Sequence, residues 1–156
     1  MTYYNENFLQ YDSAKDTDAK KFGSDWRLLI FSTDKCLHTM SLFLDWYGDG
    51  TFKICPKIFF QFYTFHCCTE KLSIPLVYCL LPDKKQETYE FSLKKIAALV
   101  RRNSNDPTNW NGPRSMIVDF ELAMMKALKS VFPQIIVHGC RFHMGKAVYA
   151  HIQACG

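Results

Sequence analysis

The sequence predicts a mixed α/β domain: a five-stranded sheet, three antiparallel strands and then parallel ones, flanked by helices. Between about residues 45 and 81, three segments rich in aromatic and β-branched residues are separated only by short breaks. Breaks of that length cannot hold crossover helices, so these segments form an antiparallel meander. From about residue 87 onward, amphipathic helical segments alternate with short apolar runs, which adds α-β units to the meander.

Residues 1–26 are polar and charged without clear periodicity, and we expect them to be a lead-in to a single domain over 27–156. Within that domain Arg27–Ser32 is typical of a short strand. Thr33 or Asp34 then caps a short helix, because both residue types accept hydrogen bonds from first-turn amides.

The meander strands are expected at about Trp46–Ile54, Phe59–Cys67 and Pro75–Leu81. A helix from about Glu87 to Arg102 follows, because its apolar residues recur at helical spacing and form one buried stripe: Tyr89, Leu93, Ile96 and Val100.

Four further elements complete the sheet and the helices that cover it. A strand is expected at Ser115–Phe120, a helix at about Glu121–Phe132, a strand at Gln134–Gly139 and a last helix at His143–Ala154. We expect the helix at 121–132 to bury one side, made of Leu122, Met125, Leu128 and Phe132. A right-handed crossover lays the strand at 115–120 parallel to the first meander strand, on that strand's free side.

Composition and charge exclude several classes of protein. With 156 residues, 48% of them hydrophobic, the chain suits one packed domain. No apolar stretch approaches the ~20 residues of a membrane span, and the polar N-terminus is unlike a signal peptide, so we expect an intracellular protein with no membrane partner. Seven cysteines, an odd number without a Cys-x-x-Cys motif, indicate reduced thiols rather than a disulfide framework.

Two aspartates carry the functional hypothesis. Asp49 lies between two glycines in the first meander strand, and Asp119 follows the apolar run at 115–118. The topology places them on neighbouring strands, and two carboxylates brought together suit a divalent-metal site. The local alternatives are a Gly-Asp-Gly turn for Asp49 and a helix N-cap for Asp119. Gly48 and Gly50 would let a substrate approach closely, or would permit a β-bulge.

Several motifs follow one another in an order that resembles one known family. They are Gly48-Asp49-Gly50-Thr51-Phe52-Lys53, Pro75-Leu76-Val77-Tyr78, Leu80-Leu81-Pro82-Asp83-Lys84, Glu87-Thr88-Tyr89, Asp119-Phe120-Glu121-Leu122-Ala123, Phe132-Pro133 and Cys140-Arg141-Phe142-His143. Together they resemble the transposase domain of Mutator-like elements (MULE), a DDE transposase of the ribonuclease H-like superfamily.

The resemblance implies a ribonuclease H-like sheet and metal-dependent DNA strand cleavage and transfer. Asp49 and Asp119 match the first two acids of the DDE triad, which bind Mg²⁺ or Mn²⁺ in a two-ion site. The third acid of the family, a glutamate, lies further along than Gly156, so the resemblance covers a C-terminally incomplete catalytic domain. We therefore expect this chain to be inactive by itself. The partners implied are transposon ends and target DNA, the location implied is the nucleus, and a homo-oligomer is left open.

Cys140 and His143 match the Cys-x-x-His element of the superfamily, and their role is open. Zinc is not expected, because a structural site needs two more ligands, to be drawn from His66, Cys67, Cys68 and His138. Otherwise they are a packed cysteine and a histidine at the rim of the site. Glu121 is expected to be a solvated acid of the first helical turn.

Five cations are expected near the carboxylates, where phosphates would bind, although scattered solvated charges explain each of them equally well: Lys53, Lys57, Arg114, Arg141 and Lys146. Trp110 either stacks on a base or packs on its own domain. Besides the transposase, two functions stay open: a domesticated or truncated remnant that binds DNA or protein without cutting, and another ribonuclease H-like nuclease. The Cys-x-x-His element disfavours the second.

Overall fold

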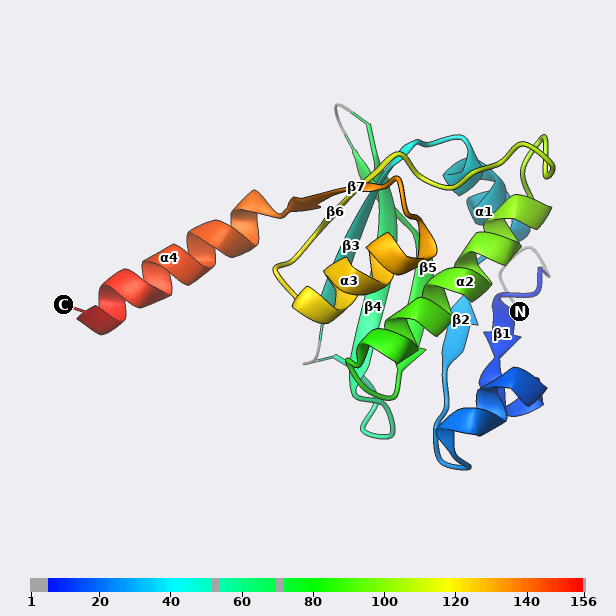
Figure 1. Ribbon diagram of the computed structural model, residues 1–156, viewed down its shortest axis with the longest axis horizontal. Coiled ribbons are helices and arrows are strands. Elements are labelled where there is room, and N and C mark those ends of the chain that lie inside the picture. The colour runs from blue at the N-terminus through cyan, green and yellow to red at the C-terminus, as the bar shows by residue number, and fades with distance from the viewer. Residues whose placement is uncertain (1–5, 52–53, 70–71, 156) are drawn as a thin grey trace.

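The computed structural model describes residues 6–51, 54–69 and 72–155, which form a mixed α/β structure around one sheet (Figure 1). Within these residues the sheet has seven strands in the order β1-β2-β5-β4-β3-β6-β7. The strands are β1 (Leu9–Asp12), β2 (Leu29–Phe31), β3 (Asp45–Thr51), β4 (Gln61–Cys68), β5 (Ser73–Leu81), β6 (Ser115–Val118) and β7 (Ile136–Gly139).

The centre of the sheet confirms the topology predicted from the sequence. Strands β3, β4 and β5 form the antiparallel meander. Strand β6 then lies parallel to β3 on its free side, and β7 lies parallel to β6. The carboxyl ends of β3, β6 and β7 therefore meet at one edge of the sheet.

The expectation of five strands is wrong, because β2 and β1 extend the sheet beyond β5. Strand β2 was expected at Arg27–Ser32, but not its pairing with the outer edge of β5 through Leu29↔Leu80 and Phe31↔Tyr78. Strand β1 lies in the polar segment 1–26, whose charge pattern did not indicate a strand, and it pairs antiparallel with β2. An apolar edge such as that of β5 needs a partner strand, and these two segments supply it.

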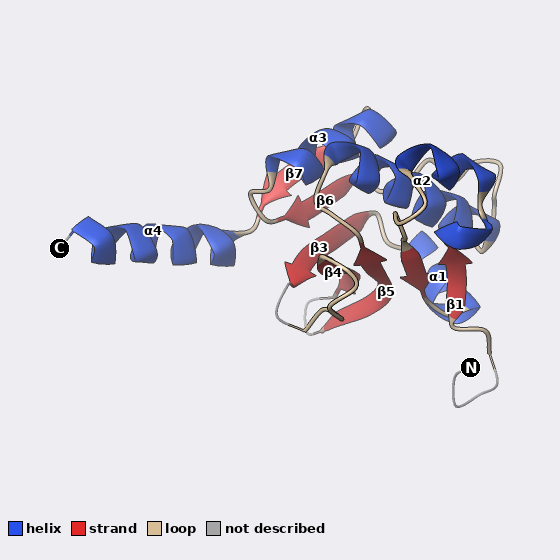
Figure 2. Cartoon of the chain, turned by 90° about the horizontal axis from the view of Figure 1, so that it is seen from below, coloured by secondary structure: helices blue, strands red, loops and turns tan. Residues whose placement is uncertain are grey.

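The helices lie within a few residues of their expected positions: α1 (Asp34–Ser41), α2 (Gln86–Arg102), α3 (Leu122–Val131) and α4 (Arg141–Cys155). Two 3-10 helices, η1 (Ser13–Lys15) and η2 (Thr17–Phe22), follow β1. Figure 2 shows α2 and α3 together over one face of the sheet, and α4 extends away from the body of the molecule. None of the helices in the described ranges is long and apolar enough to cross a membrane.

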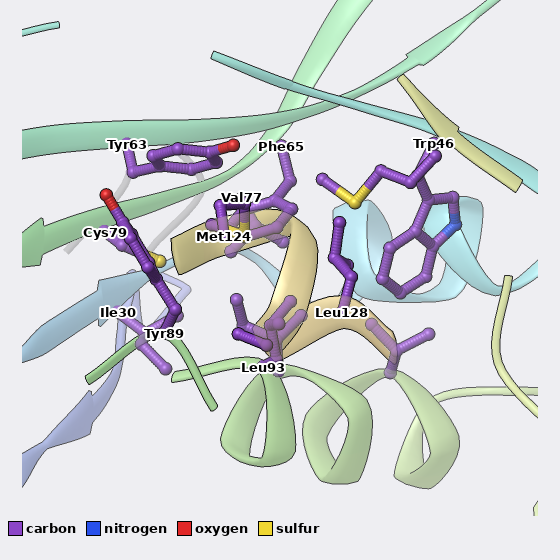
Figure 3. Close-up of a cluster of buried hydrophobic side chains, with 14 of the residues drawn as sticks. Ile30, Trp46, Tyr63, Phe65, Val77, Cys79, Tyr89, Leu93, Met124 and Leu128 are labelled. Carbon is purple, nitrogen blue, oxygen red and sulfur yellow. The ribbon is translucent and has the colours of Figure 1, made fainter. Parts of the chain in front are cut away.

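The core lies between the sheet and helices α2 and α3 (Figure 3). Residues of β4 alternate between buried and half-buried, so one face of the strand contacts the helices. The stripe predicted on α2 is confirmed, since Tyr89, Leu93, Ile96 and Val100 are all fully buried.

The predicted buried side of α3 is confirmed for Leu128 and Phe132, and Met125 packs half-buried against the core. It is wrong for Leu122, which is 62% exposed, and it missed Met124 and Ala127, which are buried. The helix begins at Leu122, just beyond the sheet, so its first apolar residue has no core to pack against.

Candidate functional site

Asp49 lies in β3, and Asp119 directly follows β6, the neighbouring parallel strand. Strands β3 and β6 are paired as Asp45↔Ser115, Trp46↔Met116 and Tyr47↔Ile117. Continued by two residues, this register sets Asp49 beside Asp119, on strands about 4.8 Å apart. The alternation of side chains places Asp49 on the face of β3 opposite Trp46, which belongs to the core.

Asp49 lies within β3 and not in a turn. The ladder with β4 runs without a shift through Gly48↔Phe65, Asp49↔Thr64 and Gly50↔Tyr63. The turn and the bulge considered from the sequence are therefore both wrong. The carboxylate is 49% exposed, and His143 Nε2 lies 3.6 Å from its Oδ1. Burial lowers the pKa of the His66 imidazole, and the negative charge of Asp49 partly opposes this shift.

Asp119 lies in the turn between β6 and α3. The N-cap residue of α3 is Glu121, without a side-chain capping bond, so the N-cap alternative for Asp119 is wrong. Its Oδ1 instead accepts a 3.4 Å hydrogen bond from the backbone N–H of Glu121. This bond holds the Asp119 carboxylate close to the backbone just after β6.

The glycines beside Asp49 make room for buried side chains of β4. A Cβ at Gly48 would lie 2.6 Å from the hydroxyl of Tyr63, and one at Gly50 would collide with Nε2 of Gln61. Both glycines face the helices, whereas Asp49 faces the other way. Packing against Tyr63 and Gln61 accounts for both glycines, and close approach of a substrate, the other role considered for them, stays a prediction.

A polar cluster lies behind these glycines. The Tyr89 hydroxyl contacts Gln61 Oε1 at 2.7 Å and Glu121 Oε2 at 2.9 Å. Glu121 was expected to be solvated, which is wrong: it is partly buried, and burial raises the pKa of its carboxyl. Tyr63 is fully buried, and burial followed by the charge of Asp119 raises its pKa well above the usual value.

The sequence analysis did not single out Gln61, Tyr63 or Tyr89 as functional residues. Of these three residues, only Gln61 could have been noticed in the sequence. It is a polar amide at the start of a predicted strand that is otherwise rich in aromatic residues, and this strand follows the one that carries the glycine-flanked Asp49. Tyr89 was assigned to the core stripe, where it does lie, but its hydroxyl needs a polar partner that periodicity cannot reveal.

Cys140 and His143 lie at the junction of β7 and α4. The Cys140 N–H donates to Val118 O at 2.7 Å, which ties the junction to the end of β6. One turn into α4, His143 reaches Asp49, and its Nδ1 is buried with no hydrogen-bond partner among the described residues. The Cys-x-x-His element thus has its cysteine beside the end of β6 and its imidazole, from the first turn of α4, beside the acid on β3.

The described residues contain no group of three or more histidines, cysteines, aspartates and glutamates that could hold a metal ion. Of the zinc ligands considered, Cys67 is buried, and burial raises the pKa of its thiol to about 12. His66 Nε2 is 2.8 Å from Thr64 Oγ1, and His138 is exposed on β7. All seven cysteines are free.

A family model of the MULE transposase domain matches residues 46–147, more than half of the chain. The chain belongs to the MULE transposase domain family. The match begins in β3, before Asp49, and ends in α4, after His143, so it spans the whole candidate site. No curated protein and no solved structure matches the chain. Membership in this family implies a transposase-related function and DNA as a partner in general.

Two of the cations expected at the site of this MULE domain do lie at the carboxyl ends of β3 and β7. Lys57 is exposed in the segment after β3, and Arg141 is exposed at the start of α4. Lys146 is further along α4, with Nζ 4.5 Å from the Phe142 ring centroid. Lys53 lies outside the described residues.

Arg114 is at the wrong end of the sheet for the role expected of it. It precedes β6, whereas Asp119 follows it, and its Nη2 lies 2.7 Å from Asp45 Oδ2. Trp110 is half-buried against Trp46, with ring centroids 6.2 Å apart, so of its two readings the packed one is confirmed.

Proposed function

We propose that this MULE domain is part of a DDE-type transposase catalytic domain of ribonuclease H-like fold, which cleaves and transfers DNA strands with the help of divalent metal ions. The observation that carries the proposal is the parallel register of β3 and β6, which, continued by two residues, sets Asp49 beside Asp119 within the matched region. The order β5-β4-β3-β6-β7 supports the fold assignment.

The residues present fit a hard divalent cation. Carboxylate oxygens are the ligands that Mg²⁺ and Mn²⁺ prefer. No lysine or arginine of the described residues forms an ion pair with Asp49 or Asp119. Asp49 and Asp119 would hold the ion, which when bound activates the attacking oxygen and stabilises the leaving oxygen of a phosphoryl transfer.

The other residues at this edge bind and orient the substrate. Lys57 and Arg141 lie at the same end of the sheet as the acids, where they would contact DNA phosphates. His143 lies beside Asp49 and keeps that carboxylate on the open face of β3. A nuclear location follows from DNA as the substrate.

Calorimetric titration with Mn²⁺ tests the proposed site. We expect the wild-type chain to bind Mn²⁺, and Asp49→Asn and Asp119→Asn each to weaken binding by more than the roughly 10- to 100-fold typical of losing an outer-shell partner. Asp45→Asn is the matched control, because Asp45 is on the same strand and face as Asp49. Binding by either site variant with wild-type affinity would overturn the proposal.

A second candidate function is a non-catalytic DNA- or protein-binding module derived from a transposase. It is favoured by the finding that the described residues contain no group of three acids, histidines or cysteines placed around one ion. Binding to DNA that is equally strong with and without Mn²⁺, in the wild type and in Asp49→Asn, would support this function over the first.

A further inference from the structure

The buried polar cluster behind β3 consists of Gln61, Tyr63, Tyr89 and Glu121. It joins β4, the first turns of α2 and the N-cap of α3, at the end of the sheet where Asp49 and Asp119 lie. Gln61, Tyr63 and Tyr89 have no exposed surface. Figure 3 shows Tyr63 and Tyr89 close together between the sheet and the helices.

We propose that Tyr89 is a positioning residue for the metal site: its hydroxyl, held by Gln61, fixes the turn from Asp119 to Glu121 and thereby the Asp119 carboxylate. The inference rests on the proposed function, because it assigns a role in the same metal site. It goes beyond that function by adding a residue from a helix that supplies no acid to the site.

The first step is the bond between Tyr89 and Glu121. One hydroxyl proton cannot serve both Gln61 Oε1 and Glu121 Oε2, although both lie within 2.9 Å of it. Both contacts are satisfied when Glu121 carries a proton, or when the Gln61 amide is turned so that Nε2 donates to Tyr89 and Tyr89 donates to Glu121. Gln61 Nε2 has no hydrogen-bond partner in the described part of the chain as oriented, which favours the turned amide. Either way Tyr89 holds the Glu121 side chain.

The second step leads from Glu121 to Asp119. The Glu121 backbone N–H donates to Asp119 Oδ1, so the residue whose side chain Tyr89 holds also contacts the metal-site carboxylate. The residue between them is held from the other side, because the Phe120 ring lies where a side chain of Gly139 on β7 would be. The turn is thus fixed by α2 on one side and by β7 on the other.

The third step reaches Asp49. Gly48 and Gly50 lie against Tyr63 and Gln61, so the same cluster sets how closely β3 and β4 pack on both sides of Asp49. The Tyr63 hydroxyl is buried without a hydrogen-bond partner among the described residues, and the charges that act on it include those of Asp119 and Asp49. The cluster therefore contacts the backbone that carries each acid.

The plain alternative is that Tyr89 is only a core residue of the α2 stripe. A phenylalanine would fill the same space, since the hydroxyl adds little volume. A role in packing alone therefore predicts that Tyr89→Phe changes stability and leaves metal affinity as it was. A positioning role predicts that the affinity falls even where the fold persists.

The test compares Mn²⁺ affinity and thermal unfolding in two variants. We expect Tyr89→Phe to weaken Mn²⁺ binding roughly 10- to 100-fold, the range found when an outer-shell partner of a metal ligand is removed. The matched control is Tyr11→Phe, which removes a 2.7 Å hydroxyl–carboxylate bond to Asp16 away from the site. We expect Tyr11→Phe to keep wild-type affinity, even if its unfolding temperature falls as far.

Glu121 supplies a second arm if Tyr89→Phe does not fold. Glu121→Gln keeps an oxygen for the Tyr89 hydroxyl and should retain affinity within a few-fold, whereas Glu121→Ala should lose as much as Tyr89→Phe. The inference is overturned if Tyr89→Phe binds Mn²⁺ as tightly as the wild type does. If Tyr89→Phe does not fold, wild-type Mn²⁺ affinity in Glu121→Ala overturns it instead. Failure of the wild type to bind Mn²⁺ overturns the proposed function instead, so the two failures are distinguishable.

Discussion

Strand β3 carries one aspartate at its start, Asp45, and one near its end, Asp49, both on the same face. The two carboxylates differ in how many partners they have within the protein. Asp45, at the start, accepts hydrogen bonds of 2.7 Å from Ser115 Oγ and from Arg114 Nη2. These partners, Ser115 first, hold the pKa of its carboxyl below the usual value. Asp49, at the far end, has only His143 as an ion-pair partner among the described residues, at 3.6 Å.

The difference separates a structural acid from one that is available to a ligand. Asp45 joins β3 to the residues before and at the start of β6, and its charge is balanced within the protein. The same end of the sheet adjoins a groove of about 830 Å³ whose charged lining residues are Lys94, Arg101 and Arg114. At the other end of β3, the register with β6, continued by two residues, sets Asp49 beside Asp119 instead. The two acids share a residue type, a strand and a face, so we infer that their partners decide the role.

The largest expected effect concerns metal binding, where the two acids should behave in opposite ways. Asp49→Asn should reduce Mn²⁺ affinity by more than about 100-fold, because a direct ligand matters more than an outer-shell partner. Its free energy of unfolding should stay within about 0.5 kcal/mol of wild type, as for surface substitutions without partners. Calorimetry and urea unfolding measure the two quantities, and a large loss of stability in Asp49→Asn would assign it a structural role like that of Asp45.

The next effect concerns the space behind Asp49. Gly48→Ala should lower the free energy of unfolding by about 1–3 kcal/mol, because the added methyl group meets the Tyr63 ring and overpacks the core. Gly145→Ala is a suitable control, since a Cβ there meets nothing within 4 Å. Equal stability of Gly48→Ala and wild type in urea would show that the cluster yields easily and does not restrain β3.

Disrupting the contacts between Asp45 and its partners should have a smaller effect on the free energy of unfolding. Asp45→Asn weakens two hydrogen bonds, one of them charge-assisted, and should cost about 1 kcal/mol of unfolding free energy. Arg114→Ala should cost less, about 0.2–1 kcal/mol, because the pair is largely exposed. Neither variant should change Mn²⁺ affinity. A loss of affinity in Asp45→Asn would mean that the two ends of β3 are coupled.

The last expected effect is a pH dependence of stability that comes from Asp16, which, like Asp45, has hydrogen-bond and ion-pair partners inside the protein. Bonds from Lys95 Nζ at 2.6 Å and from Tyr11 lower the pKa of Asp16 to about 2. Because the folded-state pKa is below the unfolded value, the stability that Asp16 contributes is present above about pH 4. It should be lost as the pH falls towards 2. In Asp16→Asn the unfolding temperature should therefore decrease less between about pH 4 and pH 2 than it does in the wild type. The same decrease in both proteins would contradict a stabilising role for the Asp16 carboxylate.

The central topology could be predicted because it depends on local patterns. Short breaks between β3, β4 and β5 exclude crossovers, and the α2 stripe identifies the helix that brings the chain to β6. Strand β1 could not be predicted, because its four residues are too few to show a pattern and form a strand only against the edge supplied by β2.

The places of Asp49 and Asp119 in the fold could be predicted from the sequence, whereas the residues that surround them could not. Asp49 and Asp119 are recognisable from glycine flanks and strand ends. The positions of Glu121 and Arg114 are set by tertiary contacts, with Tyr89 and with Asp45 respectively, and no local spacing contains these contacts. Arg114 in particular is close to Asp119 in sequence but lies at the other end of β6.

The most direct test of the account is anomalous X-ray scattering from crystals of the wild-type chain soaked in Mn²⁺. We expect a manganese peak between the carboxylates of Asp49 and Asp119, and no such peak in Asp49→Asn crystals. A wild-type structure in which manganese binds only elsewhere, or in which the two carboxylates point away from each other, would contradict the claim that these acids share an ion.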